Sequence, residues 1–271
     1  MIVCGHSKVE PVESGWKIRI DERVGRALNL FPGQILFGAS EEATSRLFLS
    51  PLRLNSHVSF FRVFLEDVRG SLASITSLFS DRGINILSGG AFGFGNIWVS
   101  EFVADFKGVE ASPEGIVNEI EGLGGFVNSR EITELFPKAF ELESTYELRS
   151  DSEGMFFLLP EPPRGMDQPT RLYAALKAWP QVQALFIDFV ASRDRLLRIT
   201  AKIGDVPGSL NKLAALLGTQ LNLHAIHEQH HDEVSGEWTI YGMLEIGSVD
   251  ELREKAKGVP TILKFDVEPL G

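Results

Sequence analysis

The stretch Asp67-Val68-Arg69-Gly70-Ser71-Leu72 recurs in this chain as Asp205-Val206-Pro207-Gly208-Ser209-Leu210, with five of the six residues identical. Alternating apolar residues precede each copy, which predicts a strand. Apolar residues at helical spacing follow each copy, which predicts an amphipathic helix. The repeated stretch therefore marks a junction between a strand and a helix, and it indicates an internal duplication.

Beyond each predicted helix, the two copies continue in the same order of elements. A strand follows the helix, then a second strand, a second helix opened by a serine with acidic residues after it, and a last strand. These features fall at 84 and 221, 97–106 and 238–246, Ser112 and Ser248, and 126–135 and 261–267. The order β-α-β-β-α-β is the ferredoxin-like arrangement, so the predicted fold class is α+β.

The repeats divide the chain into two ferredoxin-like domains, a structured connector between them and a small β-rich domain in front. The expected parts cover 1–54, 55–140, 141–194 and 195–271. Within the connector, strands are predicted over 155–159 and 182–190, with a short helix over 171–179.

Composition limits the function classes. The chain has 271 residues and a formal net charge of -11, which opposes extensive nucleic-acid contact. Only the first 56 residues are nearly balanced, with seven basic and six acidic side chains. The single cysteine, Cys4, suits a reducing compartment. No apolar run is long enough to cross a membrane, and the N-terminus lacks the features of a signal peptide. We therefore expect a cytoplasmic protein without membrane contact.

The glycine in each copy of the repeated stretch gives it the properties of a binding loop. Glycine permits a tight turn and lets a ligand approach the backbone. The first N–H groups of the following helix lack internal partners and suit a carboxylate. Asp67 and Asp205 can accept hydrogen bonds from an ammonium group. Together these groups suit a free amino acid, although Gly and Asp are also ordinary turn formers.

The loop, its apolar helix and the Ile84-Asn85-Ile86 or Leu221-Asn222-Leu223 that follows resemble ACT domains, over residues 57–136 and 195–268. The resemblance implies that these domains pair within and between chains, as a dimer or tetramer. It also implies that they bind an amino acid or similar metabolite at their interfaces, although some ACT domains serve only for assembly. The residues implicated are Asp67, Val68, Arg69, Gly70, Ser71, Leu72, Asn85, Asp205, Val206, Pro207, Gly208, Ser209, Leu210, Asn222 and His224.

Residues 8–52 are predicted to form a strand, a short charged helix, a Pro-Gly turn and two strands. This is too little core to fold alone, so interlocking with a second chain is expected. The pattern is similar to the AbrB/SpoVT swapped-hairpin domain, a dimeric DNA-binding module. The residues that would face phosphates are Lys17, Arg19, Arg23 and Arg26. The family's Ile-Pro is Ile20-Asp21 here, and one of its paired arginines is Gly25, so dimerisation without DNA is an equal alternative.

A histidine cluster contains the H-E-x-x-H pattern of zinc proteases in residues 227–231. That chemistry needs a helix, whereas these residues fall on a predicted strand, where the two outer histidines would be about 13 Å apart. We therefore expect no protease. Three alternatives stay open: solvated histidines, His224 as a ligand contact, or a metal site. The metal site would use His224, His227, Glu228, His230 and His231.

No catalytic motif is present, so we expect neither an enzyme nor a cofactor. The expected function is a ligand-sensing regulatory protein that binds an amino acid or similar metabolite, with transcriptional regulation through the N-terminal domain as one output. A regulatory subunit of a metabolic enzyme that does not bind DNA is one alternative. A metal-responsive regulator is the other.

Overall fold

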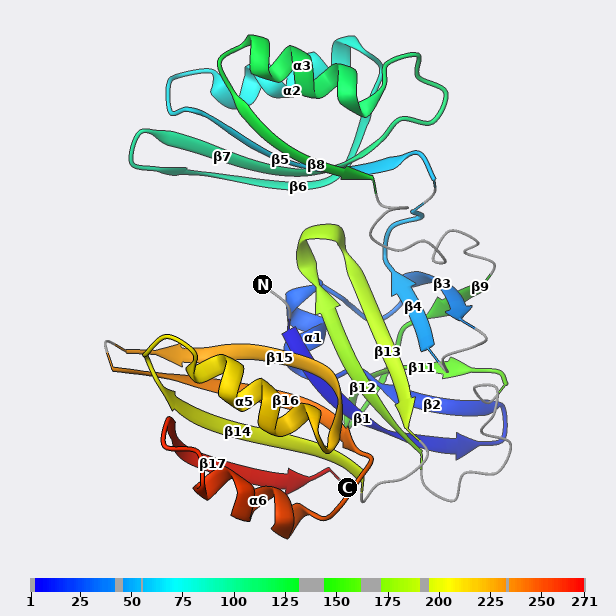
Figure 1. The fold of residues 1–271 in the computed structure, drawn as a ribbon. Coiled ribbons are helices and arrows are strands. Elements are labelled where there is room, and N and C mark those ends of the chain that lie inside the picture. The colour runs from blue at the N-terminus through cyan, green and yellow to red at the C-terminus, as the bar shows by residue number, and fades with distance from the viewer. Residues whose placement is uncertain are drawn as a thin grey trace.

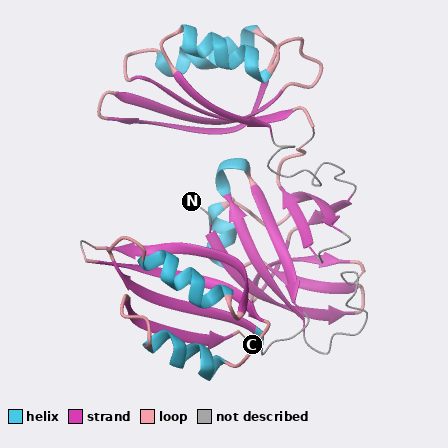
Figure 2. Ribbon diagram, viewed as in Figure 1, coloured by secondary structure: helices cyan, strands magenta, loops and turns pink. Residues whose placement is uncertain are grey.

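The computed structural model describes residues 3–41, 46–54, 56–131, 144–161, 172–190, 195–232 and 234–270. In them the chain forms one nine-stranded and two four-stranded antiparallel sheets (Figure 1). Helices cover one face of each four-stranded sheet (Figure 2). The predicted α+β class is confirmed. No helix in the described ranges combines the length and the apolar character needed to cross a bilayer.

The two four-stranded units have matching topologies. The first comprises β5 (Val58–Glu66), α2 (Ser71–Asp81), β6 (Asn85–Phe94), β7 (Ile97–Asp105), α3 (Pro113–Gly122) and β8 (Phe126–Glu131). The second comprises β14 (Leu196–Gly204), α5 (Ser209–Gly218), β15 (Leu221–His231), β16 (Ser235–Leu244), α6 (Val249–Lys257) and β17 (Ile262–Pro269). The strand orders are β6-β7-β5-β8 and β15-β16-β14-β17, so equivalent strands occupy equivalent places.

Local sequence explains the helices of these units. Ser112 caps α3 by accepting a hydrogen bond from the Gly115 N–H at 3.1 Å. Ser248 and Glu251 form a reciprocal capping box at the start of α6. The buried residues of each helix recur at helical spacing, as Ile75 and Phe79 do in α2, and pack on the sheet beneath.

The nine-stranded sheet, called the central sheet below, draws on two distant segments. The first supplies β1 (Val3–Val12), β2 (Gly15–Arg19), α1 (Glu22–Ala27), β3 (Ile35–Glu41) and β4 (Arg46–Ser50). The second supplies β9 (Ser144–Glu147), β10 (Arg149–Asp151), β11 (Gly154–Leu159), β12 (Leu172–Trp179), the short 3₁₀ helix η1 (Pro180–Val182) and β13 (Ala184–Val190). Their order is β10-β11-β2-β1-β12-β13-β4-β3-β9.

Hairpins from the two segments alternate across the central sheet. The β1–β2 hairpin lies between β11 and β12, and the β3–β4 hairpin lies between β13 and β9. From the sequence, residues 1–54 are expected to form a separate domain interlocked with a second chain, and 141–194 to form a connector. In the structure, the strands that flank the two N-terminal hairpins come from 144–190 of the same chain. Without these strands, β1 and β4 would present unpaired edges.

The helix predicted over residues 171–179 is wrong, because residues 172–179 form strand β12. Both edges of β12 are hydrogen-bonded, to β1 on one side and to β13 on the other. Its leucines and alanines favour a helix in isolation, but strand pairing and burial override that preference. The strands predicted on either side, near 155–159 and 182–190, are confirmed as β11 and β13.

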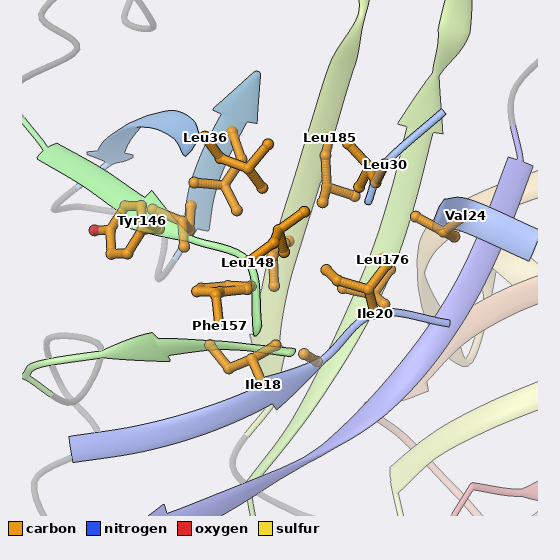
Figure 3. Packing of buried hydrophobic residues seen from close by; sticks show 14 of the residues in the cluster. Ile18, Ile20, Val24, Leu30, Leu36, Tyr146, Leu148, Phe157, Leu176 and Leu185 are labelled. Carbon is orange, nitrogen blue, oxygen red and sulfur yellow. The ribbon is translucent and has the colours of Figure 1, made fainter. Parts of the chain in front are cut away.

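Side chains from both segments fill one core of the central sheet (Figure 3). Ile18 from the first segment is fully buried with Phe157 and Leu176 from the second. Helix α1 adds Val24 to this core, and its Gly25 lies so close to β11 that an added Cβ would come within 2.8 Å of the Met155 Cε. The position at which the swapped-hairpin family has an arginine is therefore a packing position here.

Both four-stranded units pack on the central sheet through small apolar clusters. Val58, Phe60 and Val103 of the first unit are buried with Phe48 of β4 and Val182 of η1. In Figure 1 the tip of the β12–β13 hairpin points toward the sheet of this unit. The second unit buries its own cluster against β1, β12 and β13; that cluster comprises Cys4, Tyr173, Val190, Leu196, Tyr241 and Leu270.

The buried thiol of Cys4 gives a test of this packing. Burial raises its pKa to about 11, against a smaller lowering by Lys177 and Arg23. Because the thiolate is the reactive form, we expect native Cys4 to react with a chromogenic disulfide at least about a hundredfold more slowly than in the urea-unfolded chain. Stopped-flow absorbance measures both rates. Equal rates would show that the second unit does not cover β1.

Candidate functional site

The repeated loops join each first strand to its helix through a glycine in the left-handed region. Gly70 has φ of 96° and Gly208 has φ of 86°. A Cβ built on either glycine would meet no atom within 4 Å. The backbone conformation therefore requires glycine, and the space above each turn is open.

Hydrogen bonds hold the first loop against the end of β5. The Ser71 hydroxyl lies 2.8 Å from the Glu66 carbonyl oxygen and 2.9 Å from that of Val68. Ser71, which the resemblance places in the ligand pocket, therefore uses its hydroxyl to fasten the turn. The N–H groups of Leu72 and Ala73, in the first turn of α2, have no hydrogen-bond partner among the described residues.

A hollow of about 480 Å³ opens beside this loop. It is lined by Asp67, Val68, Gly70, Ser71, Leu72, Ala73, Thr76 and Trp98. Val68 and Leu72 remain 55% and 41% exposed, so apolar surface adjoins the carboxylate and the open N–H groups. The hollow thus offers one acceptor for a cation, donors for an anion and an apolar wall.

Gly93 on β6 makes room for the carboxylate of Asp67. A Cβ at Gly93 would come within 2.6 Å of the Asp67 Oδ2, so any larger residue would displace that group. The Asp67 backbone N–H donates to the Asn96 carbonyl oxygen at 2.8 Å and ties the loop to the β6–β7 turn. The β6–β7 turn therefore helps to position the acid of the hollow.

Trp98 is one of the lining residues that the sequence reasoning missed; Ala73 and Thr76 of α2 are the others. Trp98 pairs with Leu65 of β5 and Gly93 of β6, directly beside the loop. Its indole N–H donates to the Ser100 hydroxyl at 2.9 Å, which fixes the ring. Only the register of β7 against β5 reveals this position, and the loop motif carries no information on that register.

The structure separates Asn85, Asn222 and His224 from the loops with which the resemblance groups them. Asn85 pairs with Asp105, opposite Val58 at the beginning of β5, whereas the loop follows the end of β5. The eight intervening steps of strand amount to roughly 26 Å. Asn222 lies at the corresponding end of the second unit. Each helix returns the chain to the far end of the sheet before the next strand begins, so these residues do not share a hollow with the glycine turn of their own unit.

His224 takes part in a buried ion-pair cluster at the boundary with the central sheet. Its Nδ1 lies 2.9 Å from the Oδ2 of Asp188, whose side chain is only 5% exposed. Lys177 also donates to this carboxylate, and the Arg46 Nε donates to its other oxygen at 2.8 Å. Burial alone would raise the pKa of Asp188, but hydrogen bonds from His224 and Lys177 hold it well below its usual range. This contact gives His224 a structural role.

The rest of the histidine cluster lies on β15. His227 pairs with Thr239 and His231 with Gly236, so the backbone of the H-E-x-x-H stretch is extended, without the helical spacing that a shared zinc needs. The side chains of residues 227–231 lie outside the described part of the structure. Among the described side chains, no group of three or more His, Cys, Asp or Glu is placed to hold a metal ion.

The four cations expected to face phosphates all contact carboxylates of the same chain. Lys17 and Arg19 donate to Asp151, and Arg19 holds the pKa of that carboxyl well below its ordinary value, with help from Lys17. The remaining two pairs are Arg23 with Asp21, at 3.3 Å, and Arg26 with Glu22. The surface around α1 and β2 is therefore a mixture of both signs of charge.

The Asp188 cluster predicts a pH-dependent loss of stability. Because its pKa is lowered in the folded state, the cluster stabilises the fold above about pH 4, and this contribution is lost as the carboxylate protonates at lower pH. Asp188→Asn should destabilise the protein by about 3 kcal/mol at neutral pH. The difference in unfolding free energy between this variant and wild type should become smaller below about pH 4. Urea unfolding followed by circular dichroism measures both.

Asp250→Asn is the matched control for this measurement. Asp250 pairs with Arg253 at 3.1 Å on the surface, with a side chain 89% exposed. We expect a change of less than about 0.5 kcal/mol at every pH. A loss for Asp188→Asn that is no larger than that of the control would contradict the structural role of the cluster.

The sequence matches no family model and no curated protein. Among solved structures, an unknown protein from Galdieria sulphuraria is 10% identical over 79% of this chain and 99% of that chain, with a TM-score of 0.34. A candidate glycine cleavage system transcriptional repressor is 10% identical over 78% of this chain and 95% of that chain, with a TM-score of 0.28. Clostridium acetobutylicum aspartate kinase is 13% identical over 72% of this chain and 31% of that chain, with a TM-score of 0.21. Scores this low mean that only parts of each structure superpose, so function must be inferred from the site itself.

Proposed function

We propose that this chain is a cytoplasmic regulatory protein with two ACT domains, which senses an amino acid or similar small metabolite without a catalytic step or a cofactor. The observation that carries the proposal is the hollow beside Gly70. It combines the Asp67 carboxylate with the open N–H groups of Leu72 and Ala73 and with exposed apolar side chains.

An amino acid matches these groups one by one. Its ammonium group would donate to Asp67, and its carboxylate would accept from the first turn of α2. Its side chain would lie against Leu72 and Trp98. A hollow of about 480 Å³ is within the range of small-molecule sites. The same backbone turn recurs at Gly208, which supports a second site of related design.

Sensing requires that the ligand favour one arrangement of domains over another. The hollow is open on one side, where Val68 and Leu72 are exposed. Equivalent exposed residues, Val206 and Leu210, flank the second glycine turn. A ligand in the hollow would enlarge the surface that a neighbouring domain can cover, and it would shift the population toward the associated form.

Isothermal titration of the full chain with the twenty amino acids tests this function. We expect at least one to bind with a micromolar to millimolar dissociation constant. Asp67→Asn should weaken that binding about tenfold or more, because the ammonium group loses a charged acceptor. Gly70→Val should abolish it, because valine at this φ distorts the turn and fills the open space.

Asp81→Asn serves as the control, because Asp81 ends α2 far from the loop. It should bind the same ligand as tightly as wild type. The absence of binding by any amino acid, or equal binding by Asp67→Asn and wild type, would contradict the proposed site.

The ion pairs around α1 favour regulation through a protein partner over regulation through DNA binding. All four basic side chains expected to face phosphates already pair with carboxylates. We expect duplex DNA to bind weakly at low salt only, and Arg26→Glu to weaken that binding further. Fluorescence anisotropy over a salt series measures both. Tight binding at physiological salt would instead favour a transcriptional regulator.

A further inference from the structure

Each four-stranded sheet has one face covered by helices and an opposite face without helices, called the open face below, part of which packs on the central sheet. On the first unit, the part of the open face near η1 is buried against the central sheet through Phe60 and Val103. Because side chains alternate along a strand, Phe64 lies on the same face as Phe60, farther from η1. By the same alternation and pairing, the outer part of this face carries Phe64, Phe92, Ile97, Val99 and Phe126, called the aromatic patch below.

Four of these side chains form one row across the sheet. Phe126 pairs with Phe64, Phe64 with Val99, and Val99 with Phe92. The rings of Phe64 and Phe126 are 5.9 Å apart between centroids. Phe92 is 56% exposed and Phe126 is 63% exposed, which is unusual for two phenylalanines in one row.

The second unit shows that the fold does not need apolar residues in this row. Lys202 occupies the place of Phe64, since it lies three residues before Asp205 as Phe64 lies three residues before Asp67. Lys202 pairs with Glu237 and with Lys264, at the places of Val99 and Phe126. The same topology thus carries charged side chains in one unit and phenylalanines in the other. A contiguous exposed apolar surface of this kind marks an interaction site.

We propose that the aromatic patch binds the aromatic patch of a second copy of this chain, which forms a twofold dimer through the open face of the first unit. The tip of the β12–β13 hairpin occupies the inner part of that face, so a partner can cover only the outer part. The two copies then overlap only at the outer ends of their sheets. The twofold axis runs along the row of Phe126, Phe64, Val99 and Phe92, perpendicular to the strands. This inference does not depend on ligand binding at the glycine loop.

The charges next to the row fit such an arrangement. Arg62 and Glu66 lie two residues to either side of Phe64 on β5, on the same face. An antiparallel overlay of β5 on its counterpart places Arg62 opposite Glu66 of the second copy, and the reverse. The Arg62 side chain is 43% exposed, so it can make this contact while it keeps its pair with Glu101. The charges beside the patch are therefore complementary to those of a second copy.

The patch is continuous with the interface on the central sheet, but it is small. It contains only five apolar side chains, so we expect the dimer to bury an area at the lower end of specific interfaces, which bury about 1,200–2,000 Å² in total. We therefore expect a dimer with a dissociation constant on the order of 10 µM.

Sedimentation velocity of the full chain over a concentration series tests this dimer. Wild type should change from the mass of one chain to that of two as the concentration rises. The double variant Val99→Glu/Phe126→Lys, which installs the charged residues of the second unit, should weaken association at least tenfold while the circular dichroism spectrum is unchanged. Leu263→Lys is the matched control, because Leu263 is 59% exposed but lies outside the patch, and it should associate like wild type.

Cross-linking locates the surface independently. Phe92→Cys should form a disulfide-linked dimer under mild oxidation, because the axis brings residue 92 of the two copies together. Leu263→Cys should not, and Cys4 is buried and does not compete. A wild type that stays monomeric at all concentrations would overturn the proposal. So would a double variant that associates like wild type, or equal cross-linking at positions 92 and 263.

Discussion

The carboxylate of Asp188 joins three parts of the molecule that are far apart in sequence. It is buried on β13 and receives Arg46 from β4, Lys177 from β12 and His224 from the second four-stranded unit. A buried charge is costly unless it is paired and hydrogen-bonded. The strands that bring these partners together must therefore keep their register. Alternating hairpins set that register in the central sheet, and the C-terminal unit is held against it by the same group.

The sequence alone predicts the duplicated units well and the central sheet poorly. The repeat around Gly70 and Gly208 is local, and the order of strands and helices in each unit follows from apolar spacing and from caps such as Ser112 and Ser248. The pairing of β1 with β12 links residues that are widely separated along the chain. No local pattern specifies such a partner, so the interlocking segment is expected from a second chain but comes from the same one. The same limit explains why β12 is mistaken for a helix.

In the candidate site too, the loop motif predicts some residues, and others come together only through strand register. Asp67, Gly70 and Leu72 belong to one loop, so the motif places them together. Trp98 and Gly93 join them through strand register, which the motif does not encode. Asn85 does not lie beside the loop, because α2 carries the chain to the other end of the sheet before β6 begins. Duplication has also preserved the loop more closely than the open sheet faces, where phenylalanines in one unit correspond to lysines in the other. The two copies thus keep a common turn but present different surfaces.

The alternating hairpins also constrain the order in which the chain can mature during synthesis. The β1–β2 and β3–β4 hairpins leave the ribosome first, but their partners β11, β12 and β13 follow only after the whole of the first four-stranded unit. That unit has its own core, and its four strands pair only with one another, so it can fold while the N-terminal hairpins still lack partners. A nascent chain halted shortly after β8 would therefore carry one folded unit beside unpaired strand edges, and such edges are prone to misassembly.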